Sequence, residues 1–253
     1  MTTTVAVAGK GGTGKTTFSA LLIQLLIQRG TVLAIDADPS TNLHMALGLE
    51  LDGTVGDARE EMMLAIRGGS FGVGMDKRSY LDMRINEALV ESPGVDLLAM
   101  GRPEGPGCYC AANHLLRTNI DRLANGYDYV VIDNEAGLEH LSRQTTRDVD
   151  VLFLVSDPTL RGIVAAARAQ ELVHELRTRV GRVGLVVNRL NGQLPPELTA
   201  VVEQRKLVLW ATFPEDPAVR ELDAHGRPIC ELSADSPLRL AVAEAAKRAG
   251  LIS

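Results

Sequence analysis

The residues best suited to chemistry form the run Gly9-Lys10-Gly11-Gly12-Thr13-Gly14-Lys15-Thr16. This run fits G-x-x-x-x-G-K-[ST], the pattern of a phosphate-binding loop between a strand and a helix. The glycines let backbone N–H groups point at phosphate oxygens, and the start of a helix adds positive potential. Lys15 supplies a mobile charge for the β- and γ-phosphates, and the Thr16 hydroxyl can coordinate Mg²⁺. We expect the nucleotide phosphates to be bound by Gly9, Gly11, Gly12, Thr13, Gly14, Lys15, Thr16 and Thr17.

Lys10 is not required by phosphate binding as such, and its simplest interpretation is a solvated side chain. The string Lys10–Thr16, however, resembles the deviant phosphate-binding loop of the MinD, ParA and nitrogenase iron-protein class. The resemblance implies a homodimer in which Lys10 reaches across to the partner's nucleotide. Charge added in this way stabilises the transferring phosphoryl group, as an arginine finger does.

Two acidic clusters follow apolar runs: Asp36-Ala37-Asp38-Pro39 and Asp133-Asn134-Glu135-Ala136-Gly137. Side chains at strand ends of an open sheet emerge at its ligand-binding edge. A nucleoside triphosphatase needs a carboxylate on the Mg²⁺ side and a residue that orients the attacking water. By resemblance, Asp38 orients the water, Asp133 lies on the Mg²⁺ side and Gly137 lies near the γ-phosphate, while Asp36 fits either place. Ordinary capping of a strand end is the alternative for each aspartate.

Recognition of the base has the weakest sequence signal. Asn188 closes the apolar run Val186–Val187, where an Asn can pair with the edge of adenine. The segment Pro214-Glu215-Asp216 follows the last predicted strand and is expected to line the same pocket. A turn-forming Asn and a loop Pro explain the two residues equally well. The guanine-reading pattern N-K-x-D is absent, because Arg189-Leu190-Asn191 follows Asn188. We therefore expect ATP rather than GTP.

A cysteine pair lies in the turn Gly105-Pro106-Gly107-Cys108-Tyr109-Cys110, before a predicted helix whose N-terminus favours thiolates. Two thiolates do not complete a four-ligand metal site, so the simplest solution is a two-fold dimer in which each subunit donates both. His114 is an alternative ligand, and two small buried apolar side chains are the interpretation without a metal. Cys230 has no cysteine neighbour in sequence and is expected in the core.

Together these motifs resemble the carbon monoxide dehydrogenase maturation ATPases, the CooC-type nickel-insertion factors. The loop, the Asp36–Pro39 and Asp133–Leu141 segments and the placement of Cys108 and Cys110 carry the resemblance. It implies ATP-dependent dimerisation, binding of nickel or zinc by the paired cysteines, and carbon monoxide dehydrogenase as client. Lys10, Lys15, Asp38 and Asp133 are then the catalytic residues.

Two alternatives remain open at this stage, a redox ATPase that carries an iron–sulfur cluster and a ParA-like partitioning ATPase. Thiolates suit zinc, nickel and iron–sulfur clusters alike. No block of Lys and Arg is present to bind DNA, so no nucleic acid partner is expected.

The elements that must position these residues alternate along the chain, which predicts an α/β, doubly wound, mostly parallel sheet of about seven strands. We expect one domain over residues 1–253. Strands are predicted at Thr3–Ala8, Thr31–Ile35, Val95–Met100, Tyr129–Ile132, Val151–Val155, Val183–Val187 and Leu207–Ala211. Helices are predicted at Lys15–Gln28, Ala111–Ala124, Arg161–Thr178, Pro196–Gln204 and Leu238–Ala249. The Gly-rich region Glu50–Leu81 is expected to be an irregular surface excursion.

Composition agrees with this class. The 253 residues include only four Phe, four Tyr and one Trp, so the core must consist of aliphatic side chains. The net charge of -6 disfavours a polyanion partner. No apolar run reaches the roughly 18 residues of a membrane span, and Met1-Thr2-Thr3-Thr4 lacks the basic start of a secretory signal. We expect a cytoplasmic protein with no membrane partner.

Overall fold

The computed structural model describes residues 1–68, 76–101, 118, 120–136, 148–175 and 179–253. In this part of the chain, one sheet has the strand order β3-β4-β2-β5-β1-β6-β7-β8, with β3 alone antiparallel to its neighbour. The strands are β1 (Thr3–Gly9), β2 (Val32–Asp36), β3 (Leu89–Val90), β4 (Val95–Ala99), β5 (Tyr129–Ala136), β6 (Asp148–Ser156), β7 (Arg179–Val187) and β8 (Leu209–Thr212). The helices are α1 (Lys15–Leu26), α2 (Leu43–Leu47), α3 (Val55–Arg67), α4 (Lys77–Glu87), α6 (Leu160–Glu175), α7 (Pro196–Gln204), α8 (Pro217–Ala224), α9 (Pro237–Arg248) and the 3-10 turn η2 (Ile229–Glu231).

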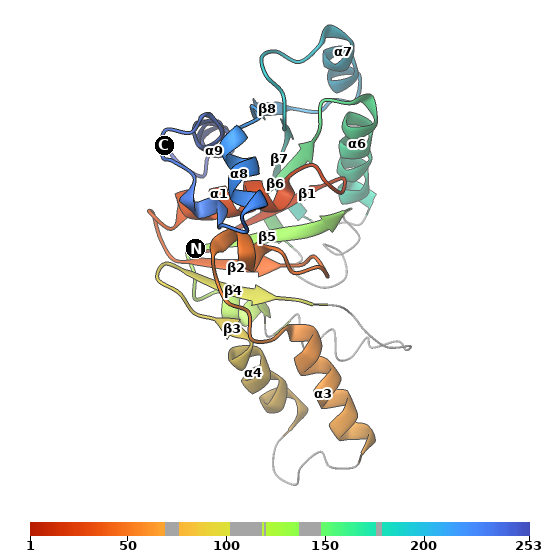
Figure 1. Ribbon diagram of the computed structural model, residues 1–253. Helices are drawn as coiled ribbons and strands as arrows, with labels where there is room; N and C mark the ends of the chain where they lie inside the picture. Colours follow the sequence, from red (N-terminus) through yellow and green to blue (C-terminus); the bar gives the residue numbers. More distant parts are fainter. Residues whose placement is uncertain (69–75, 102–117, 119, 137–147, 176–178) are drawn as a thin grey trace.

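Helices cover both faces of the sheet, which confirms the predicted doubly wound α/β class (Figure 1). Along β1, Val5 and Val7 pack with α1, α8 and α9, whereas Ala6 and Ala8 pack with the cluster that contains α3, α4 and α6. In a strand that is buried on both faces, an apolar side chain at every position stabilises the fold. The apolar residues of such a strand therefore follow one another continuously rather than alternating with polar ones.

An aromatic cluster anchors the start of α1 to the sheet. The ring of Phe18 lies 4.9 Å from Phe153 on β6 and 5.3 Å from Phe213, which follows β8. Phe153 in turn meets Trp210 of β8 edge to face at 5.1 Å. Such pairs contribute roughly 0.5–1.5 kcal/mol each beyond their burial. Because Phe18 lies in the first turn of α1, this packing holds the helix N-terminus directly beside the glycine-rich loop.

The sheet differs from the prediction at one edge. Strand β3 was not predicted, because Leu89–Val90 is only two residues long and has no periodicity to detect. The predicted helix Ala111–Ala124 lies largely outside the described residues, of which 118 and 120–124 are helical. The short helices α2 and α8 were also not predicted.

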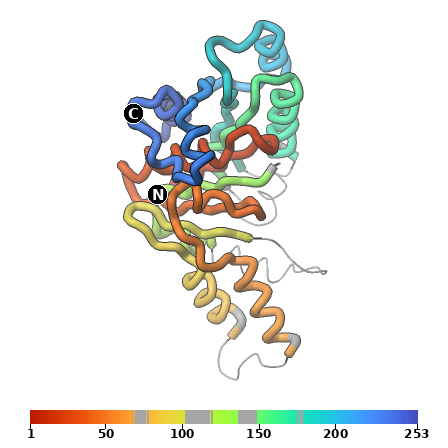
Figure 2. Tube along the Cα trace, in the orientation of Figure 1, coloured from red at the N-terminus to blue at the C-terminus, as the bar shows by residue number. Residues whose placement is uncertain are grey.

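The expectation of an irregular Glu50–Leu81 region is wrong. Helices α3 and α4 run through most of it and project from the end of the sheet where β3 and β4 lie (Figures 1 and 2). Thr54 and Asp57 form a reciprocal capping box at the start of α3, and Asp76 accepts N–H bonds at the start of α4. Cap residues of this kind fix where a helix begins.

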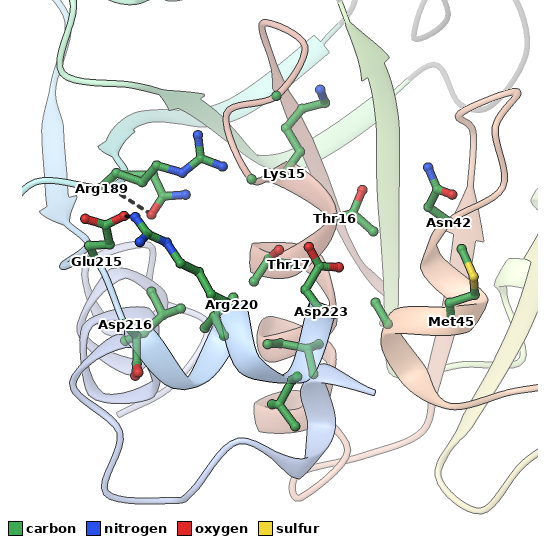
Figure 3. A pocket seen from close by; sticks show the side chains of 18 of the residues that line it. Lys15, Thr16, Thr17, Asn42, Met45, Arg189, Glu215, Asp216, Arg220 and Asp223 are labelled. Atoms are coloured by element: carbon green, nitrogen blue, oxygen red, sulfur yellow. Dashed lines mark hydrogen bonds and ion pairs between the residues drawn. The ribbon is translucent and has the colours of Figure 1, made fainter. Parts of the chain in front are cut away.

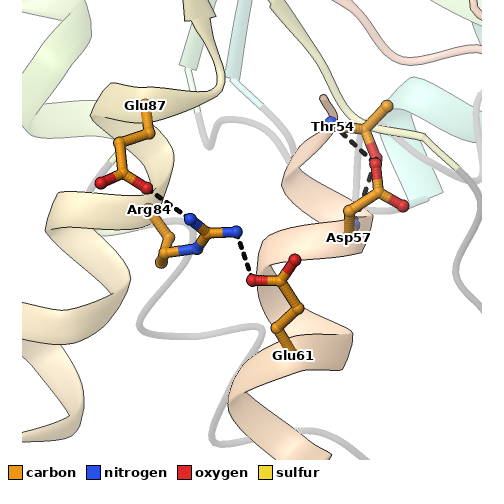
Figure 4. A network of polar contacts seen from close by, with 5 residues as sticks. All are labelled: Thr54, Asp57, Glu61, Arg84 and Glu87. Carbon is orange, nitrogen blue, oxygen red and sulfur yellow. Dashed lines mark hydrogen bonds and ion pairs between the residues drawn. The ribbon is translucent and has the colours of Figure 1, made fainter. Parts of the chain in front are cut away.

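The two helices are joined by a charge network as well as by apolar packing. Arg84 of α4 pairs with Glu87 in its own helix and with Glu61 of α3, as Figure 4 shows. Leu81 and Ile85 of α4 are buried in the same core cluster as Met62 of α3. The region is therefore a packed helical hairpin.

All the motif residues that the structure describes lie at or near the carboxyl-terminal ends of the parallel strands, along the same side of the sheet. In the register of β2 with β5, Asp36 lies beside Asp133, and the Ala37 N–H donates to the Asp133 carbonyl at 2.9 Å. Gly9 at the end of β1 lies beside Val155 of β6.

Among the described residues, no helix is both long and apolar enough to cross a membrane.

Candidate functional site

The loop between β1 and α1 requires glycine at two positions. Gly14 precedes α1 with φ 89°, a left-handed conformation that other residues adopt only with strain. A Cβ on Gly9 would lie 2.1 Å from the carbonyl oxygen of Val155, so only glycine allows the loop to leave β1 this close to β6. These constraints give the sequence pattern its structural basis.

The loop is closed on itself by its own side chains. The Lys10 carbonyl accepts the Thr13 hydroxyl at 2.9 Å and the Lys15 ammonium at 3.3 Å. Lys15 is buried, whereas the side chain of Lys10 is exposed. The structure thus places the two lysines differently: Lys15 lies against the loop, and Lys10 is accessible to another molecule.

Asp133 lies below the loop and makes a buried contact with the start of α1. Its carboxylate accepts the Thr16 hydroxyl at 2.6 Å and the Ser19 hydroxyl at 3.0 Å. Burial raises the pKa of Asp133 to about 7, against these two hydrogen bonds, which lower it. Ser19 was not predicted as a site residue. Its signal was present, since it is a polar residue that interrupts the apolar stretch Phe18–Ile27 one turn after Lys15.

Asp36 holds the segment that carries Asp38. One of its carboxylate oxygens accepts the Asp38 N–H at 3.1 Å, and the other accepts the Leu43 N–H at 2.9 Å. Burial raises the pKa of Asp36 to about 6, against the two backbone bonds. Asp38 itself is only partly buried and accepts the Ser40 N–H at 2.9 Å. Asp36 therefore holds both ends of the segment 38–43 through its carboxylate, and Asp38 at the start of this segment lines the cavity.

This arrangement gives a prediction for Asp36→Ala. Loss of two buried backbone anchors should release the Asp38 segment and lower kcat for ATP hydrolysis by roughly tenfold or more, given the usual cost of unpaired buried groups. The affinity for Mg-ADP should change much less, because the phosphate loop is intact. Steady-state kinetics and calorimetric titration check both values. Asp150→Ala is the control, since Asp150 also accepts a backbone N–H, from Thr4 at 2.8 Å, but is exposed. An equal loss of affinity and of kcat would contradict the positioning role.

A cavity of about 1080 Å³ opens beside the loop (Figure 3). Its walls come from the loop and α1, the Asp38 segment and α2, the end of β7, and α8. The volume and the mixed polar and apolar lining suit a nucleotide-sized ligand. The predicted site residues among those that line it are Gly11, Gly12, Gly14, Lys15, Thr16, Thr17, Asp38, Asn188 and Pro214. Glu215 and Asp216, expected beside Pro214, also line it, and lining residues that were not predicted include Asn42, Met45, Arg189, Arg220 and Asp223.

The end of the cavity predicted to bind the base is built by contacts between the segment after β7 and the segment after β8. The Leu190 N–H donates to the Phe213 carbonyl at 2.9 Å, and the Glu215 N–H donates to the Asn191 side chain at 3.2 Å. Glu215 also pairs with Arg220 of α8. These bonds bring Pro214 next to the cavity mouth, although Pro214 and Asn188 are 26 positions apart in sequence.

The predicted metal ligands cannot be placed. Cys108, Cys110 and the alternative ligand His114 lie outside the described residues, as does Gly137. Among the residues that are described, no group of three or more His, Cys, Asp and Glu has the arrangement of a metal site. Cys230, expected in the core, is only partly buried, because η2 holds it near the surface; its thiol donates to the Leu47 carbonyl at 3.7 Å. Burial nevertheless raises the pKa of the Cys230 thiol.

Comparison with known proteins agrees with this geometry. Residues 4–229 match the CobQ/CobB/MinD/ParA nucleotide binding domain. The chain is 41% identical over 245 residues to an uncharacterized ATP-binding protein of Methanocaldococcus jannaschii, covering 96% of this chain and 97% of that protein. It is 31% identical over 247 residues to the carbon monoxide dehydrogenase accessory protein CooC of Rhodospirillum rubrum, with 90% of each covered.

The fold agrees as well. The septum site-determining protein MinD of Pyrococcus horikoshii, solved with Mg-ADP, superimposes with a TM-score of 0.69 at 22% identity, covering 98% of this chain and 95% of that one. From the domain match and the similar relatives, the chain belongs to the CobQ/CobB/MinD/ParA family of nucleotide-binding proteins.

Proposed function

We propose that this protein is an ATP-hydrolysing switch that works as a homodimer and delivers a metal ion, nickel or zinc, to a client enzyme. The observation that carries the hydrolytic part is the hydrogen bond from the Thr16 hydroxyl to the buried Asp133 carboxylate beneath the phosphate loop. It joins the start of α1 to the end of β5, so that a nucleotide on the loop is linked to a strand that leads directly into the predicted second switch.

The donor set fits Mg²⁺. Thr16, Asp133 and Asp36 offer only hydroxyl and carboxylate oxygens, the ligands that this hard cation prefers. Burial raises the pKa of both aspartates, and a bound cation would favour their charged form. We propose that Thr16 and Asp133 hold Mg²⁺, which neutralises charge on the β- and γ-phosphates when bound with ATP.

The chain's own residues then have distinct tasks in hydrolysis. Lys15 leaves its contact with the Lys10 carbonyl and meets the β- and γ-phosphates. Asp38, held by Asp36, orients the attacking water. Loss of the γ-phosphate removes the contacts that hold the two switch segments, which releases the dimer geometry.

Lys10 is proposed to act on the nucleotide of the partner subunit. The Lys10 side chain is exposed, so it can reach a partner subunit, whereas the Lys15 side chain is buried against its own loop. Subunits carrying Lys10→Ala and subunits carrying Lys15→Ala should each be inactive alone. When mixed they should regain part of the activity, because the heterodimer contains one site with both lysines. Phosphate release across a series of mixing ratios measures this. Absence of rescue, with mixed dimers shown to form, would rule out the role in trans.

The metal-delivery part is supported by Cys108 and Cys110 and by the similarity to CooC over nine-tenths of both chains. We propose that each subunit donates both thiolates to one shared site and that apo carbon monoxide dehydrogenase is the client. The test is activation of nickel-free carbon monoxide dehydrogenase by the purified protein with Mg-ATP and Ni²⁺. The proposal predicts activation that ADP does not support. A brown protein with an iron–sulfur spectrum after anaerobic purification would instead favour the redox alternative.

A further inference from the structure

Asn188 was predicted to read the base, yet its amide lies on the phosphate loop. Its Nδ2 donates to the Thr13 carbonyl at 2.8 Å, and its Oδ1 accepts the N–H of Arg189 at 2.9 Å. Its own N–H donates to the Ser156 carbonyl at 2.8 Å. The side chain thus joins the end of β7 to the loop that follows β1, across β6 between them.

The bond to Thr13 fixes the orientation of one peptide unit of the loop. The Thr13 carbonyl and the Gly14 N–H belong to the same planar trans peptide, so they point in opposite directions. With the carbonyl held towards Asn188, the Gly14 N–H points away from it. Backbone N–H groups of such a loop are what bind phosphate oxygens. Asn188 therefore controls the direction of a donor that the phosphates use.

The glycine at position 14 leaves the space that the Asn188 amide occupies. A Cβ on Gly14 would lie 2.4 Å from Asn188 Nδ2, so any larger residue would displace the amide. Gly14 is thus required twice, by its φ of 89° and by the space that Asn188 occupies. The loop and the end of β7 fit each other.

We infer that Asn188 is a positioning residue for the phosphate loop and that its main contribution to nucleotide affinity is made through the phosphates. The inference rests on the proposed ATP-binding function of this site. An amide has two N–H groups and two acceptor lone pairs, and the two contacts in the structure already occupy one of each. Because the bond to the Thr13 carbonyl acts on the loop itself, loss of Asn188 should weaken the binding of any polyphosphate, with or without a base.

The test compares two ligands that differ only in the nucleoside. The dissociation constants of Mg-ATP and of magnesium tripolyphosphate are measured by calorimetry for the natural protein, Asn188→Ala and Asn188→Ser. Both substitutions remove the amide that bonds the Thr13 carbonyl, so the binding of both ligands should weaken by the same factor, roughly tenfold. Thermal unfolding checks that the variants are folded, and two variants guard against failure of one.

Asn191→Ala is the matched control. Asn191 lies three residues further along, and its side chain holds the Glu215 N–H at the opposite end of the cavity. This variant should leave tripolyphosphate binding unchanged. Tripolyphosphate binding that survives Asn188→Ala, while ATP binding weakens, would overturn the inference and make Asn188 a base reader. If the natural protein binds neither ligand, the proposed function fails as well, so the two failures are distinguishable.

Discussion

Lys15→Ala is expected to abolish Mg²⁺-dependent ATP hydrolysis. The ammonium of Lys15 lies 3.3 Å from the Lys10 carbonyl, at the mouth of the phosphate loop. In this buried position it is the charge that the β- and γ-phosphates would meet. Removal of a single hydrogen-bond donor that stabilises the transition state lowers kcat by about 10²–10³-fold. Removal of a full positive charge should lower kcat by at least as much. The measurement is phosphate release under saturating Mg-ATP.

The control for this experiment is Lys247→Ala. Lys247 lies exposed in the last turn of α9, so the same charge is removed without touching the cavity. Its turnover should equal that of the natural protein. Undiminished turnover of Lys15→Ala would contradict the assignment of the loop as the hydrolytic site, whatever effect the substitution has on nucleotide affinity.

Cys108→Ser and Cys110→Ser are each expected to eliminate tight metal binding. A closed thiolate site takes four ligands, and each subunit offers two close together in sequence. Binding should therefore saturate at about one metal per dimer, and metal should promote dimerisation even without nucleotide. Anaerobic titration with Zn²⁺ and with Ni²⁺, followed by size-exclusion chromatography, measures both. ATP hydrolysis should continue in these variants, but activation of the client should fail.

Cys230→Ser provides the comparison for the cysteine variants. The Cys230 thiol is partly buried and donates to the Leu47 carbonyl, which a serine hydroxyl can also do. Metal binding should be unaffected. One tightly bound metal per monomer, with no shift towards dimer, would contradict a shared site and favour His114 as an additional ligand.

The sequence alone determined the sheet and the phosphate loop. Continuous aliphatic runs predict strands that are covered on both faces, and the strands β1, β2, β4, β5, β6, β7 and β8 lie where such runs occur. The glycine pattern predicts the loop because its backbone geometry excludes side chains. These signals are local, so they can be detected without knowing what packs against them.

The tertiary structure decided features that depend on distant residues. Helices α3 and α4 were missed because their apolar side chains, such as Met62 and Leu81, are buried in a cluster that residues far apart in the sequence build together. The contact of Ser19 with Asp133 joins residues 114 positions apart.

The same holds for Asp36 and Asn188. Both were predicted to lie near the nucleotide, and the partners of their side chains in the structure are backbone groups that only the fold brings within reach. A side chain's type and its position at a strand end predict where it lies, because strand ends share one edge of the sheet. What it binds there depends on which other segments reach the same edge, and this is determined by the packing of the whole chain.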